Sequence, residues 1–284
     1  MNDRGAAWLS WTATALVMGV FLLMMGDIVW RGAPQLSWAF LLEAPSSAGR
    51  AGGIGPILVA TLWILLVALG TAVPLGVASA VWLSEFSRAN PRRQRLVRLS
   101  LDTLAGVPSI VFGLFGNAFF ALTLGLGFSI LSGGLTLACM ALPILIRTAE
   151  EGLRAVSPDL RQQALALGMS HNSFITRLLL PAALPALSAG VLLGIGRALA
   201  ETAALIFTSG YVDRMPGSLL DSARALSVHI YDLSMNVPGG EPRAYASALV
   251  LVLLIVLINA AVLGLASVWR RRIGWSGTHL EHSR

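Results

Sequence analysis

Long apolar stretches alternate with short polar connections along the whole chain. Six of these stretches approach the roughly 20 residues that a helix needs to cross a bilayer. Prolines and glycines interrupt several of them, which a membrane helix tolerates when its neighbours satisfy the freed backbone groups. The pattern therefore predicts an all-α integral membrane protein with six transmembrane helices. The predicted spans are residues 8–30, 57–84, 99–122, 131–149, 183–208 and 245–269.

The composition supports a lipid environment for these helices. Hydrophobic residues make up 56% of the 284 residues and charged residues 12%, whereas a soluble domain carries about 25% charged residues. The first apolar stretch is too long for the core of a signal peptide, and no convincing cleavage site of small residues follows it. We therefore expect it to form a membrane helix, peripheral to a core made by the other five.

The placement of the arginines predicts the orientation of the chain. All 20 basic residues are arginine, and the cytoplasmic loops of membrane proteins are enriched in basic residues. If the N-terminus is cytoplasmic, most arginines fall inside, and Arg197 falls within a span. Both termini are therefore expected in the cytoplasm, and the net charge of +6 requires no nucleic-acid partner. The inside set is Arg4, Arg88, Arg92, Arg93, Arg95, Arg98, Arg147, Arg154, Arg161, Arg177, Arg270, Arg271, Arg272 and Arg284, and the outside set is Arg31, Arg50, Arg214, Arg224 and Arg243.

The common signatures of catalysis and metal binding are missing from the sequence. Cys139 is the single cysteine, which excludes an intrachain disulfide and a cysteine metal cluster. The chain has no lysine and therefore no standard phosphate-binding P-loop. We expect a non-catalytic membrane subunit that binds no metal and no cofactor of its own, with energy supplied by another chain.

A polar segment at about residues 150–182 separates the fourth and fifth apolar stretches. Ser157 and Pro158 have the residue types of a helix N-cap and a first helical position. Gly168 suits a left-handed cap at the end of that helix, and Pro181 is expected to interrupt a second short helix. Two short cytosolic helices favour docking into a groove of a partner. Packing against the inner ends of the membrane helices is the alternative interpretation.

This segment resembles the EAA motif of ABC-importer permeases. The motif reads Glu-Ala-Ala, three residues, Gly, nine residues, an apolar residue, one residue and Leu-Pro; here Gln162 replaces its glutamate and Gln163 its first alanine. The resemblance implies the type I ABC-importer permease fold, with a coupling helix seated in a cleft of the ATPase subunit. It also implies an N-terminal helix and outer loop (1–56), a transmembrane domain (57–269) and a cytoplasmic tail (270–284). The matching residues are Gln162, Gln163, Ala164, Gly168, Leu178, Leu180 and Pro181.

Four further ordered motifs are similar to phosphate-importer permeases of the PstA type. They lie at residues 52–56, 105–113, 142–151 and 194–203. PstC-type permeases share several of them, but the short N-terminus and the pattern around Arg147 favour the PstA type. The resemblance implies a place in the bacterial inner membrane and three partners: a PstC-type permease, a PstB-type ATPase dimer and a PstS-type periplasmic phosphate-binding protein. ATP and magnesium are expected on the ATPase.

Arg197 and Glu201 are the candidate residues of a substrate pathway. They are four residues apart, so a continuous helix places both on one face. A charge at membrane depth costs about 2.5–3.5 kcal/mol on insertion scales, so such groups face a protein interior or a wet pathway. A guanidinium presents a fork of donors that matches phosphate oxygens. We expect Arg197 to contact a passing anion, with Glu201 holding it while the pathway is empty.

Other interpretations remain open at this point. Arg197 and Glu201 can instead form an internal ion pair that fixes their helix to a neighbour. An intramembrane arginine favours an anion without selecting its size, so molybdate, sulfate or phosphonate is an alternative cargo. The chain can also act as a scaffold that reports phosphate status, or as an independent secondary carrier.

Overall fold

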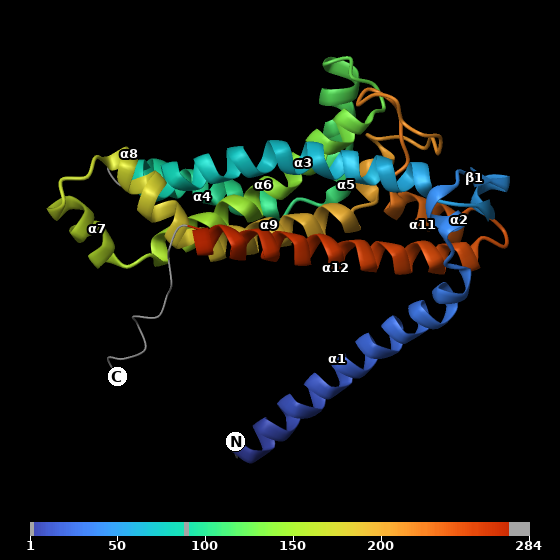
Figure 1. Cartoon of the computed structure of the whole chain (residues 1–284), viewed down its shortest axis with the longest axis horizontal. Coiled ribbons are helices and arrows are strands. Elements are labelled where there is room, and N and C mark those ends of the chain that lie inside the picture. Colours follow the sequence, from blue (N-terminus) through green and yellow to red (C-terminus); the bar gives the residue numbers. More distant parts are fainter. Residues whose placement is uncertain (1–2, 88–90, 273–284) are drawn as a thin grey trace.

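The computed structural model describes residues 3–87 and 91–272 as a bundle of long helices (Figure 1). The loop-rich outer end holds α2, the two-stranded antiparallel sheet and α11, and the opposite end holds α7 and α8. Most of the predicted tail, at residues 273–284, lies outside the described residues. The elements are α1 (Asp3–Gly32), α2 (Trp38–Leu42), β1 (Pro45–Ser46), β2 (Ala51–Gly52), α3 (Gly55–Val81), α4 (Pro91–Ala105), α5 (Ser109–Gly116), α6 (Ile130–Ala155), α7 (Pro158–Ala166), α8 (His171–Phe174), α9 (Leu180–Ala200), α10 (Ala203–Ile206), α11 (Leu226–Met235) and α12 (Glu241–Arg272).

Short helical turns extend or join several of these helices. The 3-10 turns are Ala33–Gln35 and Ser47–Gly49, and the π-helical turns are Trp82–Phe86, Asn117–Thr123 and Ile175–Leu179. With these turns included, five helical stretches in the described residues are long and apolar enough to cross a membrane. They correspond to the first, second, fourth, fifth and sixth predicted spans, and they make the chain a multi-pass membrane protein. The stretches are Ala7–Gln35, Gly55–Phe86, Ile130–Ala155, His171–Ala200 and Glu241–Trp269.

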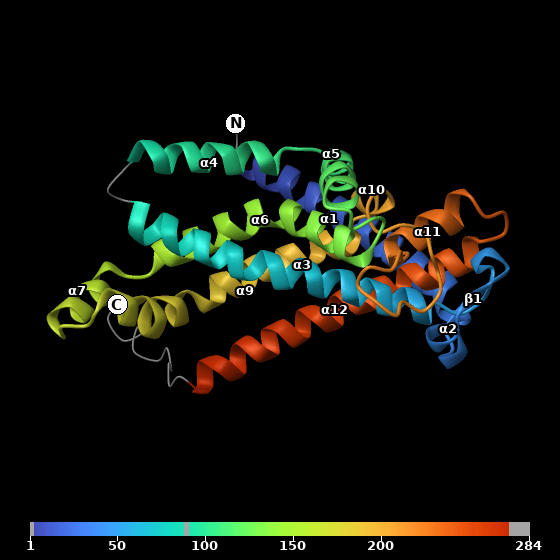
Figure 2. The same ribbon diagram turned by 90° about the horizontal axis from the view of Figure 1, so that it is seen from above.

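The third predicted span is not one helix. The structure breaks residues 99–122 into α4 and α5, whose axes are bent by 99°. Pro108 lies in an extended conformation just before α5, with φ −60° and ψ 143°. The residue before a proline disfavours the helical region, and the proline has no N–H to continue the helical ladder. The predicted third span is therefore broken, and α4 and α5 together are long and apolar enough to count as one bent span. The helix α4 runs along the bundle, whereas α5 turns across it (Figure 2).

The fifth span differs from the prediction at both ends. It begins earlier, at His171, because the π-helical turn Ile175–Leu179 leads directly into α9 and places Pro181 in the first turn of that helix. A proline is tolerated in a first turn because its missing N–H has no helical partner there. Pro181 therefore does not interrupt the helix. The span also ends earlier, at Ala200, since Glu201 adopts an extended conformation with ψ 128°.

Small residues bring α3, α6 and α9 close together at the centre of the bundle. A Cβ at Gly134 on α6 would lie 2.5 Å from the Val67 side chain on α3. A Cβ at Gly152 on α6 would lie 2.2 Å from the Ala186 methyl on α9. Close backbone approach of this kind is a main source of helix association in membranes.

The first helix is peripheral, as the sequence predicts. Its most apolar window is unburied, and α1 diverges from the bundle along most of its length (Figure 1). It is held near its C-terminal end, where a Cβ at Gly32 would meet the Tyr245 carbonyl oxygen on α12 at 2.7 Å.

A buried histidine organises the outer end. The helix α11 begins at Leu226. His229 on α11 is buried beneath Gly49, where a Cβ would lie 2.9 Å from the imidazole Cε1. Burial and the nearby Arg224 guanidinium lower the pKa of His229 to about 4, opposed by Asp232. Arg224 itself forms an ion pair with Asp232 at 3.2 Å.

Substituting Gly152 by Ala is expected to destabilise the bundle by about 1–3 kcal/mol, the usual range for overpacking. The Ala186 methyl cannot rotate away from the new Cβ. Gly70→Ala is the matched control, because its Cβ would meet nothing within 4 Å. Thermal unfolding in detergent measures both variants; equal melting temperatures for them would contradict this account of the α6–α9 contact.

The neutral His229 is expected to make stability fall on acidification. Above pH 6.5 the imidazole is neutral in both states, whereas below it the unfolded chain binds a proton that the folded chain rejects until about pH 4. At pH 5 the loss amounts to about 2 kcal/mol, from about 1.4 kcal/mol per pH unit. His229→Gln should reduce the difference in melting temperature between pH 7.5 and pH 5. An unchanged difference in His229→Gln would refute this assignment.

Candidate functional site

The coupling segment, residues 157–181, forms the tip of the molecule at the end opposite the sheet (Figure 1). The hydroxyl of Ser157 accepts a hydrogen bond from the Asp159 N–H at 3.2 Å, and Pro158 is the first residue of α7. Gly168 follows with φ +65°. These features confirm the predicted start and end of the helix, because each is set by local backbone chemistry.

The residues of the EAA-like motif divide between a buried and an exposed face. Ala164 is buried and packs in an apolar cluster with Leu178 and Leu180. Gln162 and Gln163 are exposed on α7. The side chains of Leu165 and Leu167 are also exposed, at 71% and 77%. The segment therefore packs against the helix bundle through one face, as the alternative interpretation expects, and presents amides and leucines on the other.

An ion pair ties this segment to the inner end of α3. Arg161 on α7 donates to both carboxylate oxygens of Glu85, at 2.5 and 2.8 Å. The Glu85 side chain is 0% exposed. The Arg161 guanidinium also lies over the Phe174 ring, 5.2 Å from its centre, which is within the reach of a cation–π contact. The hydrogen bond to Glu85 raises the pKa of Arg161.

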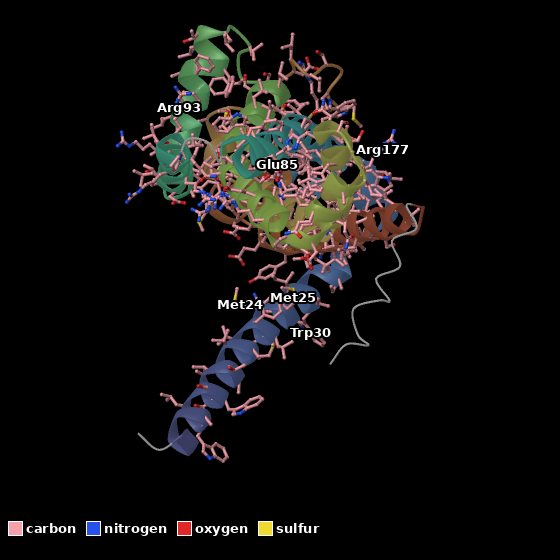
Figure 3. All side chains as sticks on the ribbon, turned by 90° about the vertical axis from the view of Figure 1, so that its left-hand side faces the viewer. Met24, Met25, Trp30, Glu85, Arg93 and Arg177 are labelled. Atoms are coloured by element: carbon pink, nitrogen blue, oxygen red, sulfur yellow. The ribbon has the colours of Figure 1, made fainter. Side chains whose placement is uncertain are left out.

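Figure 3 views the bundle from this end, with Glu85 in its middle and Arg93 and Arg177 at its rim. The sequence analysis did not identify this pair. The two residues are 76 positions apart, and no local spacing links them. The available signal was a carboxylate near the inner end of a long apolar span.

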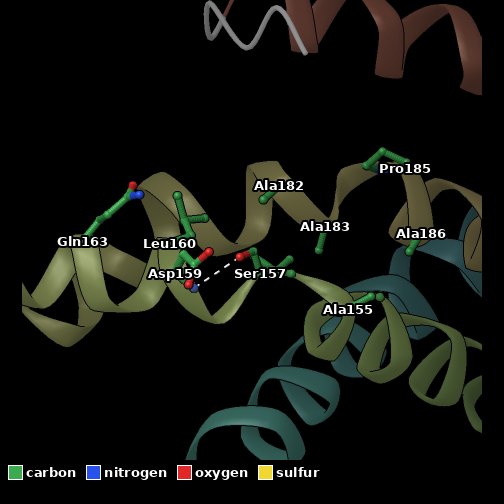
Figure 4. Close-up of a pocket in the computed structure, with 11 residues that line it drawn as sticks. Ala155, Ser157, Asp159, Leu160, Gln163, Ala182, Ala183, Pro185 and Ala186 are labelled. Atoms are coloured by element: carbon green, nitrogen blue, oxygen red, sulfur yellow. Dashed lines mark hydrogen bonds between the residues drawn. The ribbon is translucent and has the colours of Figure 1, made fainter. Parts of the chain in front are cut away.

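An apolar groove of about 490 Å³ lies beside the coupling segment. It runs between the end of α6, the start of α7 and the start of α9 (Figure 4). Its walls are mainly alanine and other apolar side chains, with a few polar groups from α7. The lining residues are Gly152, Ala155, Val156, Ser157, Asp159, Leu160, Gln163, Ala182, Ala183, Pro185 and Ala186.

A second set of ion pairs joins α4 to α6. Glu150 on α6 is buried and accepts from Arg98 on α4 at 2.6 Å and from Arg154 at 3.0 Å. Arg147 on α6 pairs with Asp102 on α4. Sequence analysis treated these arginines as markers of orientation, and it did not identify their carboxylate partners. A buried carboxylate with two arginines is compensated in charge, so this set holds α4 against α6.

Arg197 and Glu201 are not placed as the sequence predicts. Arg197 lies in the last turn of α9 on an exposed face, next to the exposed Leu193 and to Gly196, where a Cβ would meet nothing within 4 Å. Because α9 ends at Ala200, Glu201 does not share a helix face with Arg197. Its carboxylate instead accepts from the Ala204 N–H at 3.2 Å.

Neither of the predicted ion pairs for Arg197 is formed. Within residues 3–87 and 91–272, no carboxylate lies within 4 Å of its guanidinium. The expectation that Glu201 holds Arg197 is therefore not met in this conformation, and neither is the alternative of an internal ion pair between helices. What remains is an unpaired guanidinium on an open helix face.

The fold is that of an ABC-importer permease. Among solved structures, the chain is similar to an inward-facing form of the MetNI methionine ABC transporter, with a TM-score of 0.58. The match covers 76% of this chain and 94% of that chain at 19% sequence identity. An identity this low supports the fold alone.

Comparisons of the amino-acid sequence with known proteins identify the family of the chain. Residues 72–275 match the family described as "Binding-protein-dependent transport system inner membrane component". PstA 1, a phosphate transport system permease protein of Mycobacterium tuberculosis, is 35% identical, covering 83% of this chain and 77% of its own. PstA of Mycobacterium leprae is 34% identical, covering 87% and 85%. The probable ABC transporter permease protein YqgI of Bacillus subtilis is 28% identical, covering 96% and 98%.

The chain therefore belongs to the family of binding-protein-dependent transport system inner membrane components, and within it to the permeases of the PstA type. Proteins of this family are non-catalytic membrane subunits, and ATP hydrolysis takes place in a separate subunit. Membership thus implies two general kinds of partner, an ATPase and a substrate-binding protein.

The turn at Gly168 is expected to control the order of the coupling segment. Gly168→Ala adds no clash, since a Cβ there meets nothing within 4 Å, and it acts through the left-handed backbone alone. The cost for a residue with a Cβ is about 1–2 kcal/mol, which corresponds to roughly 5- to 30-fold faster local opening. Amide hydrogen exchange of α7 measures this opening. Gly168→Asn should exchange more slowly than Gly168→Ala, because asparagine tolerates this conformation better; the reverse order would contradict the argument.

Proposed function

We propose that this chain is the permease subunit of an ATP-driven phosphate importer in a bacterial inner membrane. The observation that carries the proposal is the similarity to PstA proteins at 34–35% identity over most of the chain. The unpaired Arg197 on an exposed helix face supports it, because a pathway for an oxyanion requires an accessible cation. Residues 57–269 form the transporter domain in this proposal.

The exposed face of Arg197 indicates where the second half of the pathway belongs. A charge on an open helix face is costly in lipid, so a protein or a water-filled path must cover it. We assign that cover to a homologous PstC-type permease, with the pathway between the two subunits. The planar guanidinium then donates two hydrogen bonds to one phosphate ion.

The coupling segment provides the contact with the motor. A PstB-type ATPase dimer, which carries ATP and magnesium, docks against the exposed face of α7. The exposed side chains Gln162, Gln163, Leu165 and Leu167 are available for this contact. Ala164, Gly168, Leu178, Leu180 and Pro181 shape and support the segment from behind.

The transport cycle follows from differential binding. A PstS-type periplasmic protein delivers phosphate at the outer end, and closure of the ATPase dimer on ATP moves the coupling segment. Each ligand shifts the equilibrium between inward-open and outward-open states only by its difference in affinity for the two. Hydrolysis and product release then return the permease to the inward-open state.

Substituting Arg197 by Ala tests the pathway. Hydrogen bonds to a charged group contribute about 1.5–3 kcal/mol, so phosphate uptake should fall roughly 10- to 150-fold. Arg197→Lys should retain part of the uptake, because it keeps the charge and loses the planar fork. The assay is uptake of labelled phosphate by the complete complex in liposomes, with sulfate and molybdate as competing anions.

Assembly and ATP binding should stay intact in Arg197→Ala. Arg50→Ala is the control for the loss of one positive charge; Arg50 is exposed in the outer loop and donates to the Ser47 carbonyl. Unchanged uptake in Arg197→Ala would exclude this residue from the pathway. Uptake of sulfate or molybdate in preference to phosphate would replace the proposed cargo. Uptake by the isolated chain without the ATPase would show a secondary carrier instead.

A further inference from the structure

We propose that Arg161 is a positioning residue which, through Glu85, makes the inner end of α3 move together with the coupling helix α7. The inference rests on the proposed function in one respect, that an ATPase drives movement of α7. The Arg161–Glu85 contact is then a route by which movement of α7 reaches the membrane domain. A second route is the continuous backbone from α8 to α9.

The geometry of the pair suits a rigid linkage. Both carboxylate oxygens of Glu85 are engaged by one guanidinium, at 2.5 and 2.8 Å. A bidentate contact fixes orientation as well as distance. The Glu85 side chain is fully buried and that of Arg161 is 29% exposed, so separating them takes a bidentate partner from a buried carboxylate, which is costly. The two side chains are therefore held together whenever either element is displaced.

Apolar contacts around the pair join the same elements. Phe174 on α8 packs against the Arg161 guanidinium, 5.2 Å from ring centre to guanidinium carbon. Phe86, next to Glu85, meets the His171 ring edge-on at 5.1 Å. Ala80, at the end of α3, and Ala164 on α7 belong to one buried cluster with Phe174. The inner end of α3, α7 and α8 thus form one packed unit.

The backbone alone holds α7 weakly. On one side the chain leaves α6 through Val156, which is extended at ψ 130°. On the other side it passes through the left-handed turn at Gly168, with open space around it. Rotation about either connection lets α7 tilt independently of the spans. Side-chain contacts must therefore transmit its movement, and Arg161 supplies the charged one.

The other ion pairs at this end do not connect α7 to a membrane span. Glu150 with Arg98 and Arg154, and Asp102 with Arg147, connect α4 and α6. In the described part of the chain, Arg161–Glu85 is the ion pair that joins α7 to a membrane span. Since α3 packs along α6 and contacts α9, displacement of its inner end reaches the centre of the bundle.

A distance measurement tests the linkage without reference to the cargo. Cys139→Ser removes the native thiol, and spin labels are placed at the exposed Leu165 on α7 and at Trp82, one turn before Glu85. In the complete complex, the distance between the labels should be the same without nucleotide and with trapped ATP. In Arg161→Ala the distribution of distances should become broader, and its mean should differ between the nucleotide-free state and the state with trapped ATP. A distance that changes equally in the parent complex and in the variant would overturn the inference.

Coupling between hydrolysis and transport provides the second measurement. Arg161→Ala should lower phosphate taken up per ATP hydrolysed about tenfold while hydrolysis continues. The reciprocal exchange Glu85→Arg with Arg161→Glu should restore part of the ratio, whereas Arg161→Lys should be intermediate. Arg31→Ala is the matched control, because Arg31 forms an exposed ion pair with Asp27 outside this region. An unchanged ratio in Arg161→Ala would refute the inference.

The outcomes separate this inference from the proposed function. A parent complex that hydrolyses ATP but takes up no phosphate contradicts the proposed cargo, and the label distances still decide the linkage. If Arg161→Ala fails to assemble, the exchange variant and Arg161→Lys decide it. A higher coupling ratio in the exchange variant than in Arg161→Lys supports the linkage. A lower or equal ratio overturns it.

Discussion

The structure depends first on the need to satisfy backbone polar groups where water is absent. Helices meet this need within a single segment, so the apolar stretches of the chain form helices. Where helices break, the protein covers the freed groups locally. The Ser227 hydroxyl donates to the Glu201 carbonyl at 2.6 Å, just after α9 ends. The Ser129 N–H donates to the Thr208 carbonyl at 3.0 Å, just before α6 begins. Breaks in this bundle are therefore built features of the fold.

Close packing provides the second level of organisation. Lipid chains are as apolar as leucine, so association of helices depends on close approach and polar contacts. Gly134 and Gly152 permit that approach at two levels of α6, the first towards α3 and the second towards α9. The remaining apolar surface on α1, α5 and the Arg197 face of α9 is not covered by the described residues of this chain. Such a surface fits a subunit whose pathway is completed by another protein.

Charge is concentrated at the cytoplasmic end in two separate networks. One joins α4 to α6 through Glu150, and the other joins α7 to α3 through Glu85. Both carboxylates are buried, and each has a bound guanidinium that compensates its charge. The arginines that bias the orientation of the chain thus also connect its helices. Arg197 differs from them, because it is exposed and has no carboxylate partner among the described residues.

The sequence by itself determined the membrane helices and the ends of α7. The length of the apolar stretches predicts the membrane helices. The local preferences of Ser157, Pro158 and Gly168 predict the ends of α7. Neither prediction requires contacts between distant parts of the chain. The tertiary structure decided the partner of Glu85 and the separation of Arg197 from Glu201. The first joins residues 76 positions apart. The second depends on a helix end at Ala200, where the Glu201 carboxylate accepts from the Ala204 N–H and the Ser227 hydroxyl of α11 donates to the Glu201 carbonyl. Residue spacing in the sequence predicts neither the partner of Glu85 nor the separation of Arg197 from Glu201, because each depends on elements that come into contact only after folding.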